Sequence, residues 1–185
     1  DRMTPSPARW SLEELTQDAA LASSHFRAER LAVSDAWSTH YKGARAKFEL
    51  LFQKLNDLNP NAVNNGSLAD AYGSGLSGAL RYLAGPPISD DDLQVIANVK
   101  SIAPGVLKNN PEELRKVFDV IECVIDPFRF PWVKSGITPT QEQREAALLA
   151  SSVLLAAQRI ATERRTDGKD GQEAKVKDYL LTLGF

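Results

Sequence analysis

The residues best suited to chemistry lie between Arg129 and Arg165, where six basic side chains outnumber three acidic ones. Within this region, the string RFPWVK (residues 129–134) interleaves basic and aromatic side chains, and the two prolines and the glycine of residues 126–136 prevent one continuous helix. Guanidinium groups bind phosphates and guanine edges, and exposed aromatic rings stack on bases or wedge between them. A loop that reaches outward would therefore suit DNA binding. The candidate DNA-binding residues are Arg129, Trp132, Lys134, Arg159, Arg164 and Arg165.

A second interpretation of the same segment is purely structural. Phe128, Phe130 and Trp132 would then be buried in the protein, while the charged side chains would stay in water. The sequence pattern leaves both interpretations open.

Two further motifs have simpler explanations than ligand binding. Residues 73–78 fit the nucleotide-binding pattern G-x-G-x-x-G, but that pattern needs a preceding strand, and here a helical stripe runs through the glycines. Asp90, Asp91 and Asp92 could bind a divalent cation. Three consecutive helical residues point in different directions, however, and acidic residues are favoured in a first helical turn. We expect close helix packing at the glycines and a helix start at the aspartates.

Other titratable groups form no catalytic set. Asp170, Glu173 and Lys175 resemble a nuclease D…E-x-K triad on paper, but a solvated charged helix face explains them better. His25 and His40 lack the spacing of a catalytic dyad, and we expect Cys123 in the core. No metal site is expected within this chain.

The elements that must position these residues are helical throughout. Ser11 and Glu14 have capping-box spacing, and an apolar stripe follows from Leu12 to Phe26. A second stripe runs from Trp37 to Leu58 after an expected break near Ser34–Asp35. Both stripes have heptad spacing, which predicts a long antiparallel helical hairpin.

Further helices are expected along the rest of the chain. Residues 69–83 and a short segment after Ser89 have helical stripes, and Asn110-Pro111 caps a helix that Asp126-Pro127 ends. Gln141 is expected at the capping-box position of a long helix that is apolar on most sides from residue 146 to 157, which predicts a central position. The fold prediction is all-α, a single domain over residues 1–185 with about six to seven helices.

Composition excludes several classes of protein. The 185 residues include 22 basic and 24 acidic side chains, so a globally basic coat for nucleic acid is excluded, although a local basic face is not. One cysteine excludes an intramolecular disulfide framework. The longest apolar run is too short to span a bilayer. We expect a soluble, cytoplasmic protein that makes no membrane contact.

Two segments resemble a known family. The string RYLAGPPISDDDLQVIANV (residues 81–99) and the stretch from Asp126 to Leu180 are similar to the XamI-type restriction endonucleases. The resemblance implies a protein that recognises a short duplex DNA sequence and hydrolyses both strands with magnesium. It also implies a nuclease centre beyond residue 185, so that this chain is an N-terminal helical part with no catalytic residue and no cofactor of its own.

Two functions therefore stand as hypotheses. The favoured one is a DNA-recognition or dimerisation domain of a type II restriction endonuclease, with duplex DNA and a second copy as partners. The alternative is a helical homodimerisation module with no nucleic-acid role, because the heptad stripes offer what a dimer would bury. A standalone metal-dependent enzyme has little support in the sequence.

Overall fold

The computed structural model describes residues 9–183, and the ends of the predicted domain, residues 1–8 and 184–185, lie outside the described residues. This part of the chain is all-α, with eight α-helices rather than six to seven. The elements are α1 (Leu12–Lys54), η1 (Asn56–Leu58), α2 (Asn65–Gly73), α3 (Ser77–Arg81), α4 (Asp90–Ile96), α5 (Pro104–Leu107), α6 (Pro111–Val124), α7 (Pro131–Ser135) and α8 (Gln141–Thr182). Ala84 and Ile125 form an isolated antiparallel bridge, and residues 9–183 contain no β-strand.

The first helix, α1, is one continuous element of 43 residues. It begins at the predicted capping box, in which the Ser11 hydroxyl accepts from the Glu14 N–H and the Glu14 carboxylate accepts from the Ser11 N–H. The predicted hairpin is wrong, because the helix continues through Ser34 and Asp35. Neither residue removes a backbone donor as proline would, and each weakens a helix by only a few tenths of a kcal/mol, about 0.7 at most.

The last helix, α8, has 42 residues and continues through Gly168 and Gly171. Its N-cap is Thr140, whose capping-box partner is Gln143, so the expectation that Gln141 would take that position is wrong. Gln141 is instead the first helical residue.

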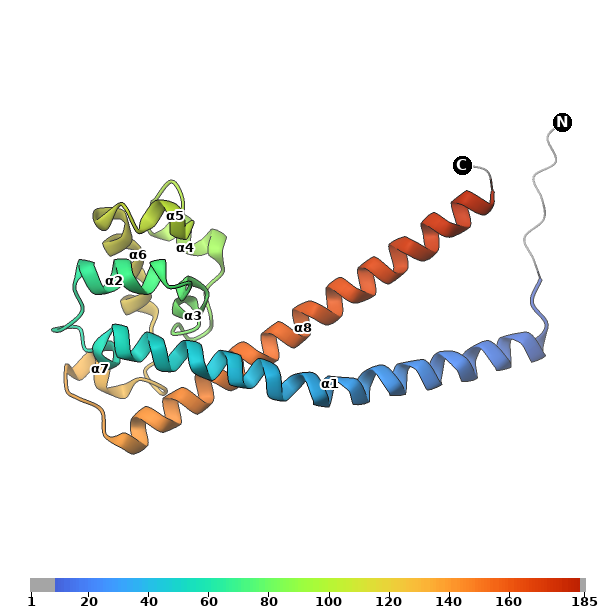
Figure 1. Ribbon diagram of the computed structural model, residues 1–185, viewed down its shortest axis with the longest axis horizontal. Coiled ribbons are helices and arrows are strands. Elements are labelled where there is room, and N and C mark those ends of the chain that lie inside the picture. The colour runs from blue at the N-terminus through green and yellow to red at the C-terminus, as the bar shows by residue number, and fades with distance from the viewer. Residues whose placement is uncertain (1–8, 184–185) are drawn as a thin grey trace.

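The core lies between the second half of α1, the first half of α8 and the short helices from α2 to α7. Phe48, Phe52, Phe130 and Trp132 are among its largest fully buried side chains. In Figure 1 the short helices gather on one side of the place where α1 and α8 cross. The hydrophobic cluster therefore forms one compact body at the C-terminal end of α1.

Helix α8 lies at the edge of this body, not at its centre. One face packs on α1 and the core through Leu148, Leu155 and Ala156. The opposite face is exposed, with Leu149 at 52% and Val153 at 39%. Residues 146–157 were predicted to be central because they are apolar on most sides of the helix. In the described residues, however, their outer face has no packing partner.

Beyond the crossing, the two long helices diverge. Figure 1 shows the N-terminal half of α1 and the C-terminal half of α8 leaving the compact body as two separate arms. We call residues 12–36 the α1 arm and residues 164–182 the α8 arm. Nearly every residue of both arms is exposed.

The middle helix α6 follows its predicted capping. The Asn110 side chain accepts from the Glu113 N–H, and Pro111 is the first helical residue. Its buried stripe includes Leu114, Phe118 and Ile121. Cys123 is exposed and not in the core as expected, because two residues after Ile121 the helix has turned by about 200°.

Candidate nucleic-acid interface

The guanidinium of Arg129 is a structural group that ties three segments together. Its Nε donates to Asp126 Oδ2 at 2.7 Å, and Nη1 donates to the Tyr82 carbonyl at 2.8 Å. Nη2 donates to the Ala84 carbonyl at 2.8 Å, and Nη1 also donates to the Ser151 hydroxyl at 3.0 Å. The side chain is only 11% exposed. Every nitrogen is occupied, so Arg129 has no free edge for a phosphate or a base.

Trp132 is likewise part of the core. It is 1% exposed, its ring packs edge-to-face on Phe130 at 5.7 Å, and its Nε1 donates to the Asp57 carbonyl at 2.7 Å. The segment expected to reach outward folds inward instead, because Pro131 starts the short helix α7 and Gly136, at φ 65°, ends it. The structural interpretation of this segment is therefore confirmed for Phe130 and Trp132, whereas Phe128 is 94% exposed.

The other four candidates keep accessible charge. Lys134 lies exposed on α7, and Arg164 and Arg165 are exposed at the start of the α8 arm. Arg159 is half-buried one turn earlier on α8. The structure thus leaves Lys134 apart from the others and brings Arg159, Arg164 and Arg165 to the region where α1 and α8 cross.

A lysine on α1 that the sequence analysis missed lies beside Arg159. Lys47 is half-buried, and burial lowers the pKa of its ammonium, with the nearby positive charge of Arg159 lowering it further. The ion pairs at this crossing use other cations, namely His40, Arg45 and Arg144. In the described part of the chain, no carboxylate forms an ion pair with Lys47 or Arg159. The sequence signal was that Lys47 has no acidic residue three or four positions away on its helix.

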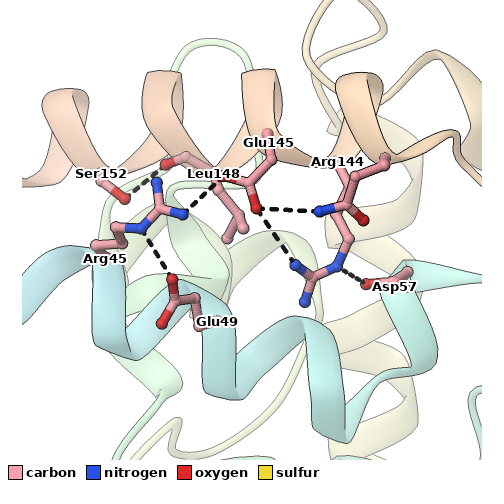
Figure 2. A network of polar contacts seen from close by, with 8 residues as sticks. Arg45, Glu49, Asp57, Arg144, Glu145, Leu148 and Ser152 are labelled. Carbon is pink, nitrogen blue, oxygen red and sulfur yellow. Dashed lines mark hydrogen bonds and ion pairs between the residues drawn. The ribbon is translucent and has the colours of Figure 1, made fainter.

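The crossing is held in place by a polar network. Figure 2 shows Arg45 of α1 donating to Glu49 and to Glu145 of α8, at 2.8 and 2.7 Å. Arg144 donates to Asp57 at 2.8 Å, just past the end of α1. Hydrogen bonding to Glu145 raises the pKa of Arg45 further above its ordinary value. Two ion-pair links between the helices therefore define where Lys47 and Arg159 lie relative to each other.

A hollow of about 700 Å³ opens where the two arms separate. Its walls carry three basic residues, Arg30, Arg164 and Arg165, and three acidic ones, Glu29, Glu163 and Asp167. Its lining residue Glu163 lies close to His40 of α1, with His40 Nε2 2.9 Å from Glu163 Oε2. The hollow is thus charge-balanced, and its lining includes neither Lys47 nor Arg159.

The close helix packing expected at the glycines is wrong, because a Cβ added at Gly73, Gly75 or Gly78 would meet no atom within 4 Å, and Gly75, at φ 73°, interrupts the helical stripe. The aspartates and the charged face of α8 follow their simpler explanations. Residues 73–78 join α2 to α3, and a helix rather than a strand precedes the glycines. Asp90 pairs with Arg81, and the Ser89 hydroxyl caps α4 by accepting from the Asp92 N–H. Glu173 pairs with Lys169 on an exposed face of α8.

The described residues do not fit a magnesium centre. Among residues 9–183, no three histidine, cysteine, aspartate or glutamate side chains converge on a site that could hold a metal ion. No hydrolytic step can be derived from this part of the chain. Nor does any helix in residues 9–183 have the length and apolar character needed to cross a membrane.

Comparison with known proteins identifies the class of this all-α protein. The chain belongs to the XamI restriction endonuclease family, whose sequence model matches residues 61–185. One relative is the type II restriction enzyme XamI of Xanthomonas campestris pv. amaranthicola. It is 71% identical over 183 residues, which cover 99% of this chain and 67% of the relative. No solved structure matches the chain.

Proposed function

We propose that this helical region is the DNA-recognition and dimerisation part of a type II restriction endonuclease. The enzyme would act in the cytoplasm, hydrolysing duplex DNA at a short specific sequence with magnesium held by residues outside 9–183. The family membership supports the activity. The observation that carries the DNA contact is the pair Lys47 and Arg159 on the two crossing helices, which are half-buried and have no carboxylate partner in the described residues. They are near enough for the charge of Arg159 to lower the pKa of Lys47.

Such a pair is unfavourable without an anion. Burial removes water from each charge, and the two positive charges repel each other. A DNA phosphate placed between them would offset both the lost hydration and the repulsion. Charge-assisted hydrogen bonds to phosphate are about twice as strong as neutral ones. The pair therefore has the character of a phosphate contact, which positions the duplex but carries no sequence information.

The neighbouring exposed cations extend this contact. Arg164 and Arg165 continue along α8 from Arg159, and Lys134 provides a separate exposed charge on α7. Arg129 and Trp132 take no direct part in the proposal, since both are engaged inside the protein. Their role is to hold α7 and the start of α8 in place.

The test is fluorescence anisotropy of a labelled duplex titrated with the chain at low salt. We expect a non-specific dissociation constant of about 10⁻⁴ to 10⁻⁶ M at physiological salt and tighter binding at low salt, without high affinity because the overall charge is slightly negative. Lys47→Gln and Arg159→Gln should each weaken binding several-fold. Lys116→Gln removes an exposed lysine from α6 and should leave binding unchanged.

The outcomes separate the two functions considered for the chain. Weaker binding in both crossing variants, with the control intact, supports the proposal. Equal binding by all variants would remove Lys47 and Arg159 from the interface. Absence of binding by the unmodified chain at low salt would favour a helical interaction module with no nucleic-acid role.

A further inference from the structure

The α1 arm carries an apolar stripe that has no partner in the described residues. Heptad spacing joins Leu12, Leu15, Ala19, Ala22 and Phe26. Leu12 is 82% exposed and Phe26 is 54% exposed. An isolated helix of this length is only marginally stable in water without packing on its apolar face. The stripe is therefore suited to an interface.

This stripe continues an interface that already exists within the chain. Along the same helix, Ala44, Phe48, Leu51 and Leu55 follow at heptad spacing, and all four are fully buried against α8 and the core. In that half of α1 the packing partner is α8, which runs antiparallel to it (Figure 1). The arm has similar apolar residue types, and Phe26 lies 18 residues before Ala44, which is five full turns and therefore the same face of the helix. A suitable partner for the arm is thus another antiparallel helix of the α8 kind.

The α8 arm carries a complementary apolar surface. Val176, Leu180 and Leu181 line a hollow on one side of this arm, bordered by Lys169, Glu173 and Lys177. Val176 and Leu183 fall on the seven-residue spacing that starts at Leu148 and Leu155, two residues that pack at the crossing. Tyr179 and Leu181, at 62% and 59%, widen the exposed apolar area.

Within residues 9–183, the two arms of one chain share only the hollow near the crossing, between Phe26 to Ala36 and Ile160 to Gly168, and separate beyond it. They diverge from a crossing that the Arg45–Glu145 and Arg144–Asp57 contacts hold (Figures 1 and 2). Residues 12–54 form one uninterrupted helix without proline, so α1 has no position at which a sharp kink is expected. Within residues 9–183, the two stripes therefore do not cover each other, and a second copy of the chain would supply a partner for both.

We propose that two copies of this chain exchange arms, so that the α1 arm of each copy packs antiparallel on the α8 arm of the other. Because each chain supplies both stripes, one two-fold axis satisfies both contacts and closes the assembly as a dimer. The arms are about 37 and 29 Å long at 1.5 Å per residue, and a helix is about 10 Å wide. Because the shorter α8 arm limits each contact to about 29 Å, the footprint is about 580 Å² per copy, near the lower end of standard interfaces at about 600 Å² per copy.

This inference deepens the dimerisation part of the proposed function, and it is independent of the DNA contact at Lys47 and Arg159. The first test is light scattering coupled to size exclusion at several concentrations. The unmodified chain should be a dimer, and Phe26→Asp or Leu180→Asp should weaken the dimer by more than about tenfold, because each loses an apolar side chain from the seam. Phe128→Asp and Val95→Asp are matched controls on the compact body, 94% and 77% exposed, and should leave the dimer intact.

A cross-linking experiment tests which arms pair. In a Cys123→Ser background, Ala22→Cys marks the α1 arm and Gln172→Cys marks the α8 arm. A mixture of the two variants should give a cross-linked species of dimer mass with a short bismaleimide, in higher yield than either variant alone. Stronger cross-linking of the Ala22→Cys variant with itself would overturn the exchange in favour of α1 pairing with α1.

Two further results would also overturn the proposal. One is a cross-linked monomer from the variant that carries both cysteines, which would show that the arms close within one chain. The other is a monomer at every concentration. Lys47→Gln should remain dimeric whatever its affinity for DNA, so failure of arm exchange and failure of the DNA contact are distinguishable.

Discussion

At the scale of single residues, the structure divides the basic side chains into framework and accessible groups. Arg129 and Arg144 looked alike in sequence to Arg159 and Arg164, since all occur in the same basic region. Their partners distinguish them. Arg129 binds a carboxylate and backbone carbonyls, and Arg144 binds a carboxylate and lies over the Phe52 ring. Arg159 has no ion-pair partner within residues 9–183. Sequence alone could not distinguish them, because their partners come from distant segments such as Tyr82 and Asp57.

Lys47 should reduce the stability of the free protein at neutral pH. Its pKa is lowered in the folded state by burial and by Arg159, so the unfolded chain binds more protons between that lowered pKa and the ordinary value of 10.5. The free energy of unfolding should therefore rise with pH across this window. Lys47→Met should be more stable than the unmodified chain at pH 7, with a difference that shrinks toward pH 10.5.

Urea unfolding at a series of pH values measures this difference. Lys116→Met is the control, because Lys116 is exposed on α6 and should show no such pH dependence. A Lys47→Met protein that is less stable at pH 7 would contradict the assignment of an unfavourable buried charge.

Arg129 should be essential for stability. Arg129→Met removes the partner of Asp126 and leaves the Tyr82 and Ala84 carbonyls without a donor, so we expect a loss of about 3 kcal/mol, measured by urea unfolding. Arg129→Lys should recover only part of this loss, because a single ammonium cannot reach all of these acceptors. A loss below about 1 kcal/mol would show that the cluster is not needed.

The Arg129 contact also sets a pH dependence. Burial alone would raise the pKa of Asp126, but hydrogen bonds from the Arg129 side chain and from the Phe128 and Arg129 N–H groups outweigh it and lower the pKa below 3.8. This contribution to stability is present above pH 3.8 and is lost as the pH falls through the lowered value. Arg129→Met should lose stability less steeply in this acid range.

At the scale of elements, helix existence and helix starts could be predicted, whereas connections could not. Ser11 with Glu14 and Asn110 with Pro111 each marked a true helix start. The break expected near Ser34–Asp35 does not exist. Polar residues interrupt the apolar stripe there, but neither a proline nor a glycine is present to end the helix. Conversely, α7 was missed because Pro131 was interpreted as a helix breaker, although it occupies the first helical position.

The glycines of α8 lead to a prediction at this scale. Gly168 and Gly171 lie inside the exposed α8 arm, and an added Cβ at either position would meet no atom within 4 Å. Gly168→Ala and Gly171→Ala should each stabilise the arm helix by up to about 1 kcal/mol. Amide hydrogen exchange along residues 164–182 should slow in both variants.

Gly75 provides the contrasting substitution. Its φ of +73° is unfavourable for a side chain, so Gly75→Ala should destabilise the α2–α3 connection instead.

For the glycines of α8, faster amide exchange in the α8 arm of Gly168→Ala would contradict the continuous helix.

At the scale of the whole molecule, the sequence was interpreted as a closed bundle, but the structure is a compact body with two arms. Periodicity identifies which residues share a face, but it does not say whether a partner helix lies in the same chain. The stripe of α1 was therefore assigned to an intramolecular hairpin, and the apolar run of α8 to the centre. In the described residues, the part of the α1 stripe from Leu12 to Phe26 is exposed, and so is the outer side of the apolar run of α8.

The sequence also could not show which basic residues of the site lie close together in space. The basic character of residues 129–165 directed attention to the correct helix, α8, and Arg159, Arg164 and Arg165 retain accessible charge. Lys47 was missed because it lies more than a hundred positions away in the chain. Only the crossing of α1 with α8 brings Lys47 and Arg159 together.

The central claim is that the crossing of α1 and α8 contacts DNA phosphates through Lys47 and Arg159. Its most direct test is the salt dependence of duplex binding for the unmodified chain and for the Lys47→Gln/Arg159→Gln double variant. Each lost phosphate contact should reduce the slope of log affinity against log salt by about 0.9, so the double variant should have a slope shallower by nearly two. Identical slopes for the two proteins, at any affinity, would contradict the claim.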